Sequence, residues 1–274
     1  MCRYQKEEVG PSCKGFVLVK FTPTERRGLV DMHNALRNKV ALGGVDLQPG
    51  ASNMRAMVWN EELAGIAERW ASQCVYGYDI CRDLGECYYY YYHRIRFSQK
   101  LDIPCLEKFP VGQNVAKGTY STSNETELVN HWFLEHRNFD ASLVAKYKIT
   151  KRKKNRHYTQ LVWADSYLLG CARAIFQQSN GSSVAYKEHL VCNYGPTGNI
   201  PDQPVYRIGK ACSECQQGTT CSTEYSALCA AELNDDLYDY LASDRTKLTT
   251  SNTHLVLFAC FISNLYCFYL DQFV

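Results

Sequence analysis

Residues 157–163 read HYTQLVW, residues 168–176 read LLGCARAIF, and residues 184–194 read VAYKEHLVCNY. We read the first stretch with a period of two, in which His157, Thr159, Leu161 and Trp163 alternate with Tyr158, Gln160 and Val162, and the other two stretches are short, largely apolar runs. Both patterns are typical of strands that are buried on at least one face. The polar residues 177–183 predict a turn between the last two strands. The second half of the chain is therefore expected to form a sheet.

Three helical segments precede these predicted strands. Residues 22–25 (Thr-Pro-Thr-Glu) supply an N-cap, a proline at the first helical position and a capping-box glutamate. Apolar residues then recur at helical spacing until the Gly43-Gly44 pair ends the pattern. Asn60 caps a second periodic segment, and a third covers residues 125–137. Helices followed by strands predict a layered α+β domain.

Composition indicates an extracellular protein. The 274 residues carry a net charge of +2, so no global charge attracts nucleic acid. Fourteen cysteines favour an oxidising compartment over a reducing one. Asn124 and Asn180 each begin a glycosylation sequon, which is useful only in the secretory pathway. We expect a secreted glycoprotein whose true start lies upstream of Met1, since no leader sequence is visible.

The composition of the sequence changes after Gly195, where a turn-rich stretch leads into a cysteine cluster. Such a module is too small to be stable through apolar burial alone. The Cys212-x-x-Cys215 spacing also suits zinc, but disulfides fit a secreted chain better. Three pairings are possible, and the sequence does not choose among them. The four cysteines are Cys212, Cys215, Cys221 and Cys229.

Two segments do not fit this pattern. Residues 83–108 contain five consecutive tyrosines and two extra cysteines, without any period that predicts packing. The tail at 230–274 ends in an apolar stretch, residues 255–270, that is short for a transmembrane helix. This tail reads either as a lipid-anchor signal or as translated non-coding sequence.

Several motifs, taken in order, closely resemble the signatures of the CAP superfamily of cysteine-rich secretory proteins, and the insect antigen 5 branch of venom allergens in particular. No single motif is specific, but the ordered set is. The matching stretches are His33–Arg37, Trp59–Ala64, Cys74–Asp83, Gly112–Ala116, His157–Trp163 and His189–Ile200.

The resemblance implies a three-layer α-β-α sandwich with a small, flexible cysteine-rich C-terminal extension. It also implies disulfides between Cys13 and Cys74 and between Cys171 and Cys192. Cys2 and Cys81 match positions whose partners would lie upstream. The expected organisation is a cysteine-bearing segment at 1–21, a CAP domain at 22–196 with an insertion at about 83–108, an extension at 197–229 and a tail at 230–274.

Members of the superfamily share a cleft of two histidines and two acidic residues that holds a divalent metal. The matching positions here are Tyr78, Gln113, Glu135 and His157. A phenol and an amide are poor zinc ligands, so only Glu135 and His157 remain as weak candidates. We expect structural roles for this set, with Glu135 as a hydrogen-bonded carboxylate. His131 and His136, which flank Glu135, are expected to point to solvent.

No catalytic residue is identified, because nucleophile and zinc-protease motifs are missing. The sequence therefore predicts a secreted, non-enzymatic binding protein with no cofactor, whose ligand is a lipid, a sterol or an extracellular protein. The alternatives are a metal-dependent or serine-type hydrolase that uses the cleft, and a lipid-anchored surface protein. The basic residues in 146–156 predict a solvated loop or a contact with sulfated glycans or anionic membranes.

Overall fold

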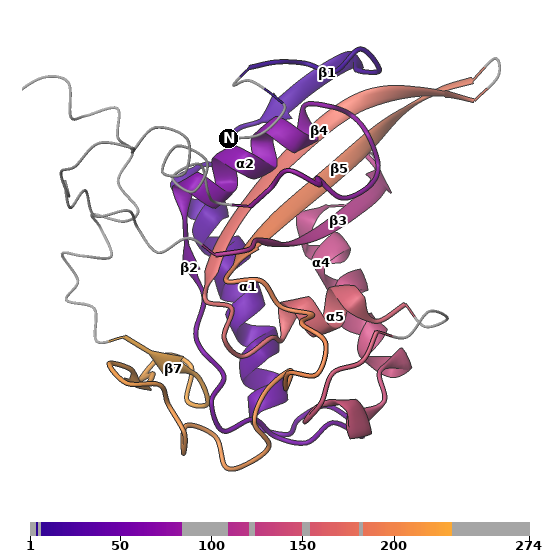
Figure 1. The fold of residues 1–274 in the computed structure, drawn as a ribbon. Helices are drawn as coiled ribbons and strands as arrows, with labels where there is room; N and C mark the ends of the chain where they lie inside the picture. The colour runs from indigo at the N-terminus through magenta and orange to yellow at the C-terminus, as the bar shows by residue number, and fades with distance from the viewer. Residues whose placement is uncertain are drawn as a thin grey trace, which may run out of the picture. The chain divides into compact units, whose positions relative to one another are not determined.

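The computed structural model describes residues 4, 7–83, 109–120, 124–149, 154–180 and 183–231. The insertion (except Asp83) and the tail from residue 232 onward lie outside these residues, as does Cys2. In chain order the elements are β1 (Lys14–Val19), α1 (Pro23–Ala41), β2 (Val58–Trp59), α2 (Glu61–Ala71), β3 (Gly112–Thr119), α4 (Glu125–Leu134), two 3₁₀ helices (Glu135–Asn138 and Ala141–Leu143), α5 (Arg156–Leu161), β4 (Leu168–Asn180), β5 (Ser183–Gly195), β6 (Thr220–Cys221) and β7 (Cys229–Ala230) (Figure 1).

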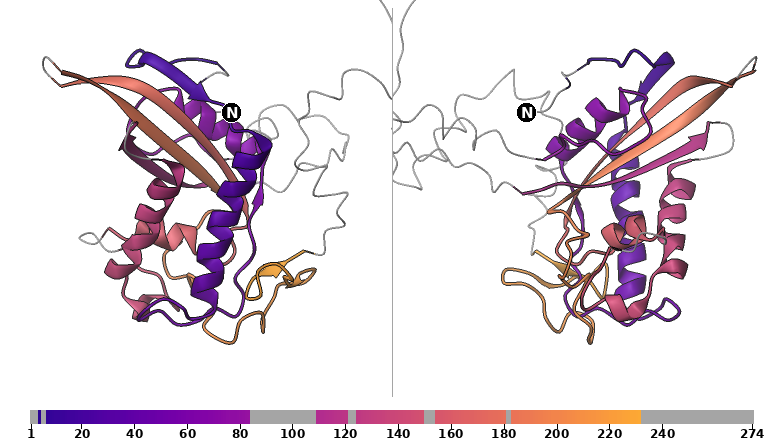
Figure 2. Two further views of the ribbon diagram at one scale, coloured as in Figure 1. Left: turned by 180° about the vertical axis from the view of Figure 1, so that it is seen from behind. Right: turned by 45° about the vertical axis from the view of Figure 1, so that its right-hand side comes forward.

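The main sheet separates two layers of helices. Its strand order is β1-β4-β5-β3, and β2 pairs in parallel with the start of β4. Helix α2 covers one face, where Trp70 packs in a cluster with Val115 and Val191. Helices α1, α4 and α5 cover the other face, around a larger core that includes Trp132 and Leu161 (Figure 2). The predicted three-layer α-β-α sandwich is confirmed.

Helix α1 begins as its sequence predicts. The Thr22 side chain accepts a hydrogen bond from the Glu25 backbone N–H at 3.3 Å, and the Thr22 N–H donates to the Glu25 carboxylate at 2.7 Å. The reciprocal pair satisfies two backbone donors at the helix start. The helix ends at Ala41, just before the predicted Gly43-Gly44 stop. Its buried face includes His33 and Arg37.

Helix α2 lies close to the sheet because β4 has a glycine beneath it. Asn60 caps the helix by accepting from the Leu63 N–H at 2.9 Å, as predicted. A Cβ atom at Gly170 would lie 2.2 Å from the Ala64 nitrogen, so any side chain there would push the helix away. The helix ends at Ala71, and Cys74 lies beyond it in a left-handed conformation, with φ of 53°.

The strand predicted at 157–163 is wrong, because residues 156–161 form helix α5. An alternating pattern indicates a strand only where one face is buried and the other is exposed. Tyr158, Thr159, Gln160 and Leu161 are all buried, so these residues have no exposed face. The buried Gln160 and Thr159 side chains find internal partners: the Gln160 Oε1 accepts from the Gly198 N–H at 3.0 Å, and the Thr159 hydroxyl donates to the Asn155 carbonyl at 3.1 Å. A short buried run has the same pattern in a helix as in a strand.

Arg37 fixes the turn that follows α5. This side chain is fully buried and donates hydrogen bonds to the carbonyl oxygens of Leu161, Trp163, Ala164 and Ser166. Backbone carbonyls at a helix end need donors from elsewhere, and one guanidinium supplies several of them here. Helix α1 thereby holds α5 and the start of β4 in place.

The hairpin of β4 and β5 is longer than predicted. Residues 177–180 and 183–187 continue the antiparallel ladder, although they were assigned to a turn or to a strand end. Ladder hydrogen bonds use the backbone, so polar side chains can occupy a hairpin that extends beyond the core. Strands β1 and β3 were not predicted. The ladder of β3 with β5 runs from Gly112 opposite Tyr194 to Thr119 opposite Lys187.

Four disulfides lie within the described residues. Cys13–Cys74 and Cys171–Cys192 are the two pairs that the family resemblance implies. In the extension Cys212 pairs with Cys221, and Cys215 pairs with Cys229, which selects one of the three pairings left open by the sequence. Cys81 is a free cysteine.

The described end of the extension belongs to the main core. The Cys229 N–H donates to the Met54 carbonyl at 2.7 Å, and the Ala227 N–H donates to Asn38 of α1 at 2.9 Å. Ala227 and Leu228 are fully buried. These contacts tie residues 227–229 to α1 and its neighbouring segment, although the resemblance implies a flexible extension.

Candidate functional site

The strongest constellation of polar side chains is a hydrogen-bonded chain of three residues. Tyr78 and His157 are joined by a hydrogen bond of 3.0 Å between the hydroxyl and Nε2. The other ring nitrogen, Nδ1, lies 2.8 Å from the Glu135 Oε1. A carboxylate only accepts, so His157 donates from Nδ1, and in the neutral tautomer that this contact selects Nε2 accepts the Tyr78 hydroxyl proton. The glutamate thereby sets the orientation of the ring.

Two helix ends bring this chain together. Glu135 is the C-cap of α4, and His157 is the second residue of α5. The Glu135 Oε2 also accepts the His157 backbone N–H at 3.0 Å, so one carboxylate holds both the ring and the start of α5. Trp132 stacks on the imidazole, with ring centroids 6.1 Å apart. Glu135 is therefore a hydrogen-bonded carboxylate.

Gln113, the fourth member of the predicted set, does not join this chain. Its side chain is buried, and its Oε1 accepts from the Asp79 N–H at 2.8 Å. Its Nε2 donates to the Asn193 Oδ1 at 2.9 Å. Gln113 thus links the segment that carries Tyr78 to strand β5.

These residues do not fit a zinc site. The Tyr78 hydroxyl and the Glu135 carboxylate already engage both ring nitrogens of His157, and both Glu135 oxygens are bonded to His157. Burial raises the pKa of Tyr78, which keeps the phenol protonated. A zinc ligand must offer a free lone pair, and neither ring nitrogen of His157 offers one without rearrangement.

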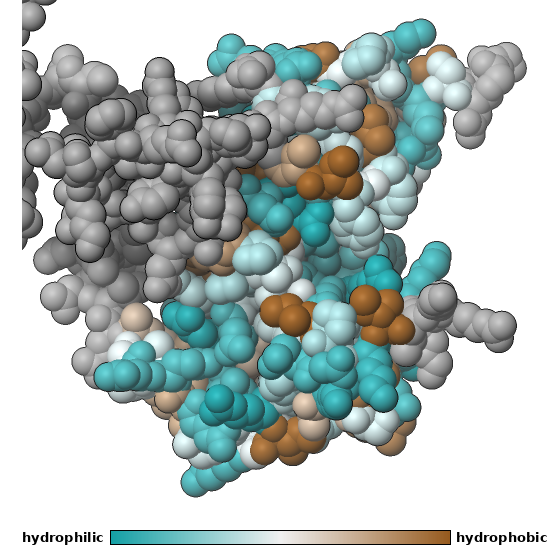
Figure 3. Space-filling view, viewed as in Figure 1, coloured by the Kyte–Doolittle hydropathy of each residue, from teal (hydrophilic) through white to brown (hydrophobic). Residues whose placement is uncertain are grey.

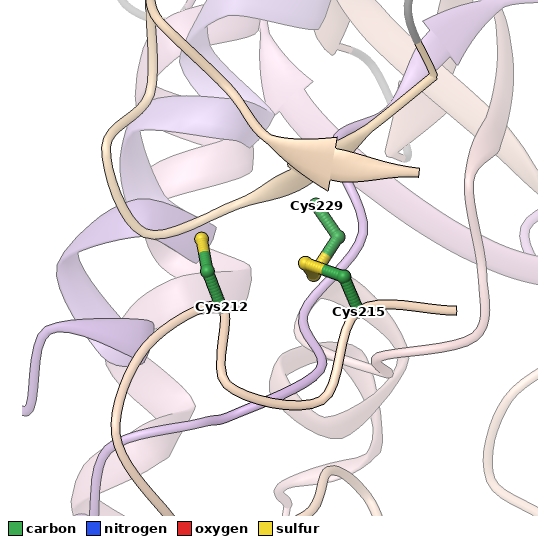
Figure 4. A group of neighbouring side chains, drawn as sticks. All are labelled: Cys212, Cys215 and Cys229. Atoms are coloured by element: carbon green, nitrogen blue, oxygen red, sulfur yellow. A yellow bond between two sulfur atoms is a disulfide. The ribbon is translucent and has the colours of Figure 1, made fainter. Parts of the chain in front are cut away.

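The one group of metal-ligand type that we find among the described residues lies in the extension. The sulfur atoms of Cys212, Cys215 and Cys229 are within 4.8 Å of one another (Figure 4). Figure 4 shows the Cys215 and Cys229 sulfur atoms joined, and the Cys212 sulfur bonds Cys221. These are disulfide sulfurs, so the zinc alternative for this cluster does not hold.

A cavity of about 290 Å³ lies beside Tyr78. Strand β3, helix α5 and the segment after β5 contribute its walls. Its lining residues are Tyr78, Arg82, Gly112, Gln113, Asn114, Tyr147, Ile149, Arg156, Gln160, Thr197, Gly198 and Asn199.

A second cavity of about 600 Å³ lies between α1 and α4. It was missed at the level of the sequence because its walls come from helix faces and a loop that meet only in the fold. The loop 44–48 closes one side. The lining residues are Leu36, Lys39, Gly44, Val45, Asp46, Leu47, Gln48, Asn130, Phe133, Leu134, His136, Arg137 and Phe139.

The two histidines beside Glu135 differ from each other. His131 is exposed, as predicted. His136 is partly buried and packs against Phe133 and Tyr158, with ring centroids 5.3 and 6.0 Å away, so the prediction of a solvent-facing side chain is wrong. Burial and the neighbouring charges of Arg137 and Lys39 lower the pKa of His136, which keeps it neutral at the cavity wall.

The remaining predicted sites are the two sequons and the basic loop. Asn124 of the first sequon is exposed and caps α4 by accepting from the Glu127 N–H at 3.0 Å. Asn180 of the second sequon is the last residue of β4. In the basic loop, Lys146 pairs with Asp202 at 3.3 Å, and Lys148, Lys154 and Arg156 are exposed. Lys151, Arg152 and Lys153 lie outside the described residues.

The surface offers no broad apolar face in the view of Figure 3. Apolar residues there form small, separate patches in a mainly hydrophilic surface, outside the parts covered by grey atoms. A large contiguous patch would be needed to indicate a membrane-binding face. Within the described residues, we find no helix with the length and apolar character needed to cross a bilayer.

Comparison with known proteins shows which proteins this chain is similar to. The profile of the cysteine-rich secretory protein family (CAP) matches residues 30–194. The chain is 35% identical over 220 residues to venom allergen 3 of Solenopsis invicta, covering 77% of this chain and 83% of that protein. It is 34% identical to venom allergen 5 of Vespula vidua, covering 75% and 90%. The crystal structure of hookworm platelet inhibitor shares the fold, with a TM-score of 0.54 and 24% identity over 79% of this chain and 95% of that one.

Proposed function

The chain belongs to the cysteine-rich secretory protein (CAP) family, and from this premise we propose that it is a secreted, non-enzymatic binding protein that carries an anionic lipid between α1 and α4. The venom allergen relatives and the four disulfides support secretion. The observation that carries the ligand class is the 600 Å³ cavity between the two helices.

The lining of this cavity is amphipathic, which suits a fatty acid. Leu36, Phe133 and Phe139 offer apolar walls. The charged lining residues are two cations, Lys39 and Arg137, and one acid, Asp46, so the wall carries a net positive charge. Small-molecule sites have volumes of roughly 300–1,000 Å³, a range that includes this cavity of about 600 Å³. An apolar tail would lie along the walls, and its carboxylate would pair with the two cations. A sterol has no such charge to offer them.

The hydrolase alternative lacks support in the described residues. The ring nitrogens of His157 engage Tyr78 and Glu135, so the histidine has an orienting carboxylate but no serine or cysteine hydrogen-bonded to it there. A raised pKa makes Tyr78 a poor nucleophile at neutral pH. The lipid-anchor alternative concerns the tail, which lies outside the described residues.

Displacement of a fluorescent fatty acid by palmitate tests the proposal. Leu134 lines the cavity and is 40% exposed, so Leu134→Asp adds a negative charge to its wall without disturbing the core. Ile200 is equally exposed and lines neither cavity, which makes Ile200→Asp the matched control. We expect Leu134→Asp to weaken palmitate binding at least about tenfold, with Ile200→Asp unchanged. Absence of palmitate binding by the unmodified protein, or equal loss in both variants, would refute the proposal.

A further inference from the structure

The cavity beside Tyr78 is lined by positive charge. Arg82 and Arg156 both border it, and no aspartate or glutamate is among its described lining residues. Glu135 lies on the far side of the imidazole, where its two oxygens are bonded to His157. The cavity therefore attracts an anion, whereas the family's cleft of two histidines and two acidic residues attracts a cation.

Arg82 is held in place at the cavity wall. Its Nε donates to the Val111 carbonyl at 2.6 Å, and its Nη1 donates to the Asp79 carbonyl. These are two of the five N–H donors of a guanidinium, so within the described residues further donors remain while the orientation is fixed. A preorganised arginine loses little conformational entropy when an oxyanion binds.

Arg156 supplies the second charge from the first residue of α5. Its side chain is exposed, and within the described residues it forms no ion pair with a carboxylate. Burial raises the pKa of Tyr78 and of Tyr147, and the positive charge of Arg156 partly offsets both rises. The guanidinium is therefore close to both phenols that line the cavity.

Most neutral polar groups of the cavity are engaged in the fold. The Thr197 hydroxyl donates to the Gly198 carbonyl at 3.1 Å, and the Asn199 amide bonds to Thr159 and to the Arg156 carbonyl. A neutral sugar would find few free donors or acceptors among them. The two guanidinium groups and the buried Tyr147 hydroxyl are left to recognise a ligand, and the two positive charges favour an anionic one.

From this arrangement we propose that the cavity binds a tetrahedral oxyanion, either free phosphate or the sulfate or phosphate ester of a small sugar. Guanidinium groups bind such oxyanions through paired N–H···O bonds, and two of them on different elements can contact one group from two sides. The volume of about 290 Å³ limits the ligand to a small molecule. The site shares no lining residue with the cavity between α1 and α4, so its test is independent of the lipid proposal.

Isothermal titration calorimetry at low salt tests this site with four probes: glucose 6-sulfate, glucose 6-phosphate, inorganic phosphate and, as the neutral control, glucose. The informative variant is Arg156→Gln, because the side chain is exposed and its loss does not disturb the core. Lys154→Gln is the matched control, since Lys154 is an exposed cation two residues away that does not line the cavity. Thermal melting of each variant checks that the fold is intact.

We expect the unmodified protein to bind the esters and not glucose. Arg156→Gln should weaken ester binding at least about tenfold, and Lys154→Gln less than about twofold. Raising the salt concentration should reduce the affinity of the unmodified protein. Tighter binding of the esters than of inorganic phosphate would identify a sugar ester as the ligand, and equal binding would identify the free anion. Failure to bind any oxyanion, or equal losses in the two variants, would overturn the proposal.

Discussion

Two buried histidines should make the folded protein sensitive to mild acid. His33 in α1 and His189 in β5 are 0% and 1% exposed. Burial lowers the pKa of each to about 4, with a smaller contribution from the positive charge of Arg37 or Lys117. His33 bonds the Leu29 carbonyl and the Tyr194 hydroxyl, whereas no hydrogen bond to the ring of His189 is found among the described residues.

The size of the effect follows from proton linkage. The unfolded state binds a proton at each histidine below a pKa of about 6.5, and the folded state does so only below about 4. The unfolded state thus holds more protons in this range, so stability is full above pH 6.5 and falls as the pH decreases toward 4. At pH 5 each histidine costs about 2 kcal/mol relative to pH 8, and the two together cost about 4 kcal/mol. A domain of this kind has a total stability of roughly 5–15 kcal/mol.

Urea denaturation of His189→Leu at pH 8 and pH 5 isolates one of the two contributions. Leucine suits the site because His189 lies between the rings of Tyr76 and Phe176, with centroids 6.4 and 6.3 Å away. We expect the variant to lose about 2 kcal/mol less than the unmodified protein between these pH values. His131→Gln, at an exposed histidine of α4, should leave the difference unchanged. An undiminished loss in His189→Leu would refute the reasoning.

Three further predictions concern the covalent framework, the insertion and the cleft. Replacing Cys13 and Cys74 by alanine, which opens a separation of 61 residues, should lower the free energy of unfolding by about 4 kcal/mol in the chain-entropy model; a loss below about 1 kcal/mol in denaturant titration would contradict it. Replacing residues 84–106 by a short glycine-serine linker should leave secretion and melting temperature unchanged, because hydrogen bonds join the two flanking segments; failure of secretion would show that the insertion is needed. Zinc should bind the unmodified protein weakly. The double variant Tyr78→His with Gln113→Glu should raise the zinc affinity at least about tenfold in calorimetry, because the cleft then has two imidazoles and two carboxylates. Tight zinc binding by the unmodified protein that is lost in His157→Ala would contradict this prediction.

Local signals predicted the features that depend on neighbours in sequence. The capping box at Thr22 and the N-cap at Asn60 set helix starts, because the atoms involved are three residues apart. The segment after Asn155 was misassigned because its burial on all sides depends on α1, α4 and residues near 198. Its carbonyl ends are satisfied by Arg37, which lies more than a hundred residues earlier. Such support is invisible in a local pattern.

For the cavities as well, some of the residues could be identified from the sequence and others could not. The family resemblance identified Tyr78 and His157 as neighbours, and the structure joins them by a hydrogen bond. It did not identify Arg82 as a cavity residue, because its place there depends on hydrogen bonds to Val111 and to the Asp79 carbonyl. A basic residue close to a cysteine carries no such information by itself. Charge in a cavity is a property of several segments that meet only in the fold.

The surroundings of Gln113 favour an amide over a metal-binding carboxylate at this position, and they predict a cost for introducing the carboxylate. The Leu63 carbonyl can only accept, so Asn193 directs its Nδ2 toward it at 3.1 Å and presents its Oδ1 to Gln113. The Asp79 N–H can only donate, so Gln113 must accept there and donate to Asn193. An amide satisfies both neighbours, whereas an ionised carboxylate does not. A carboxylate at this position would face the Asn193 oxygen without a proton, at a cost of about 1–3 kcal/mol for the unmade hydrogen bond.

The metal-free Gln113→Glu variant should therefore be less stable by that amount in denaturant titration, and the loss should decrease at acidic pH, where the carboxyl group becomes protonated and can donate. We expect burial to raise the pKa of this carboxyl group, so the folded state binds the proton more tightly than the unfolded state. The variant therefore regains stability as the pH decreases. The comparison is the difference between variant and unmodified protein at each pH, which removes the titration of the buried histidines. A variant as stable as the unmodified protein at neutral pH would show that Asn193 can reorient. The amide at position 113 would then be no obstacle to a metal site.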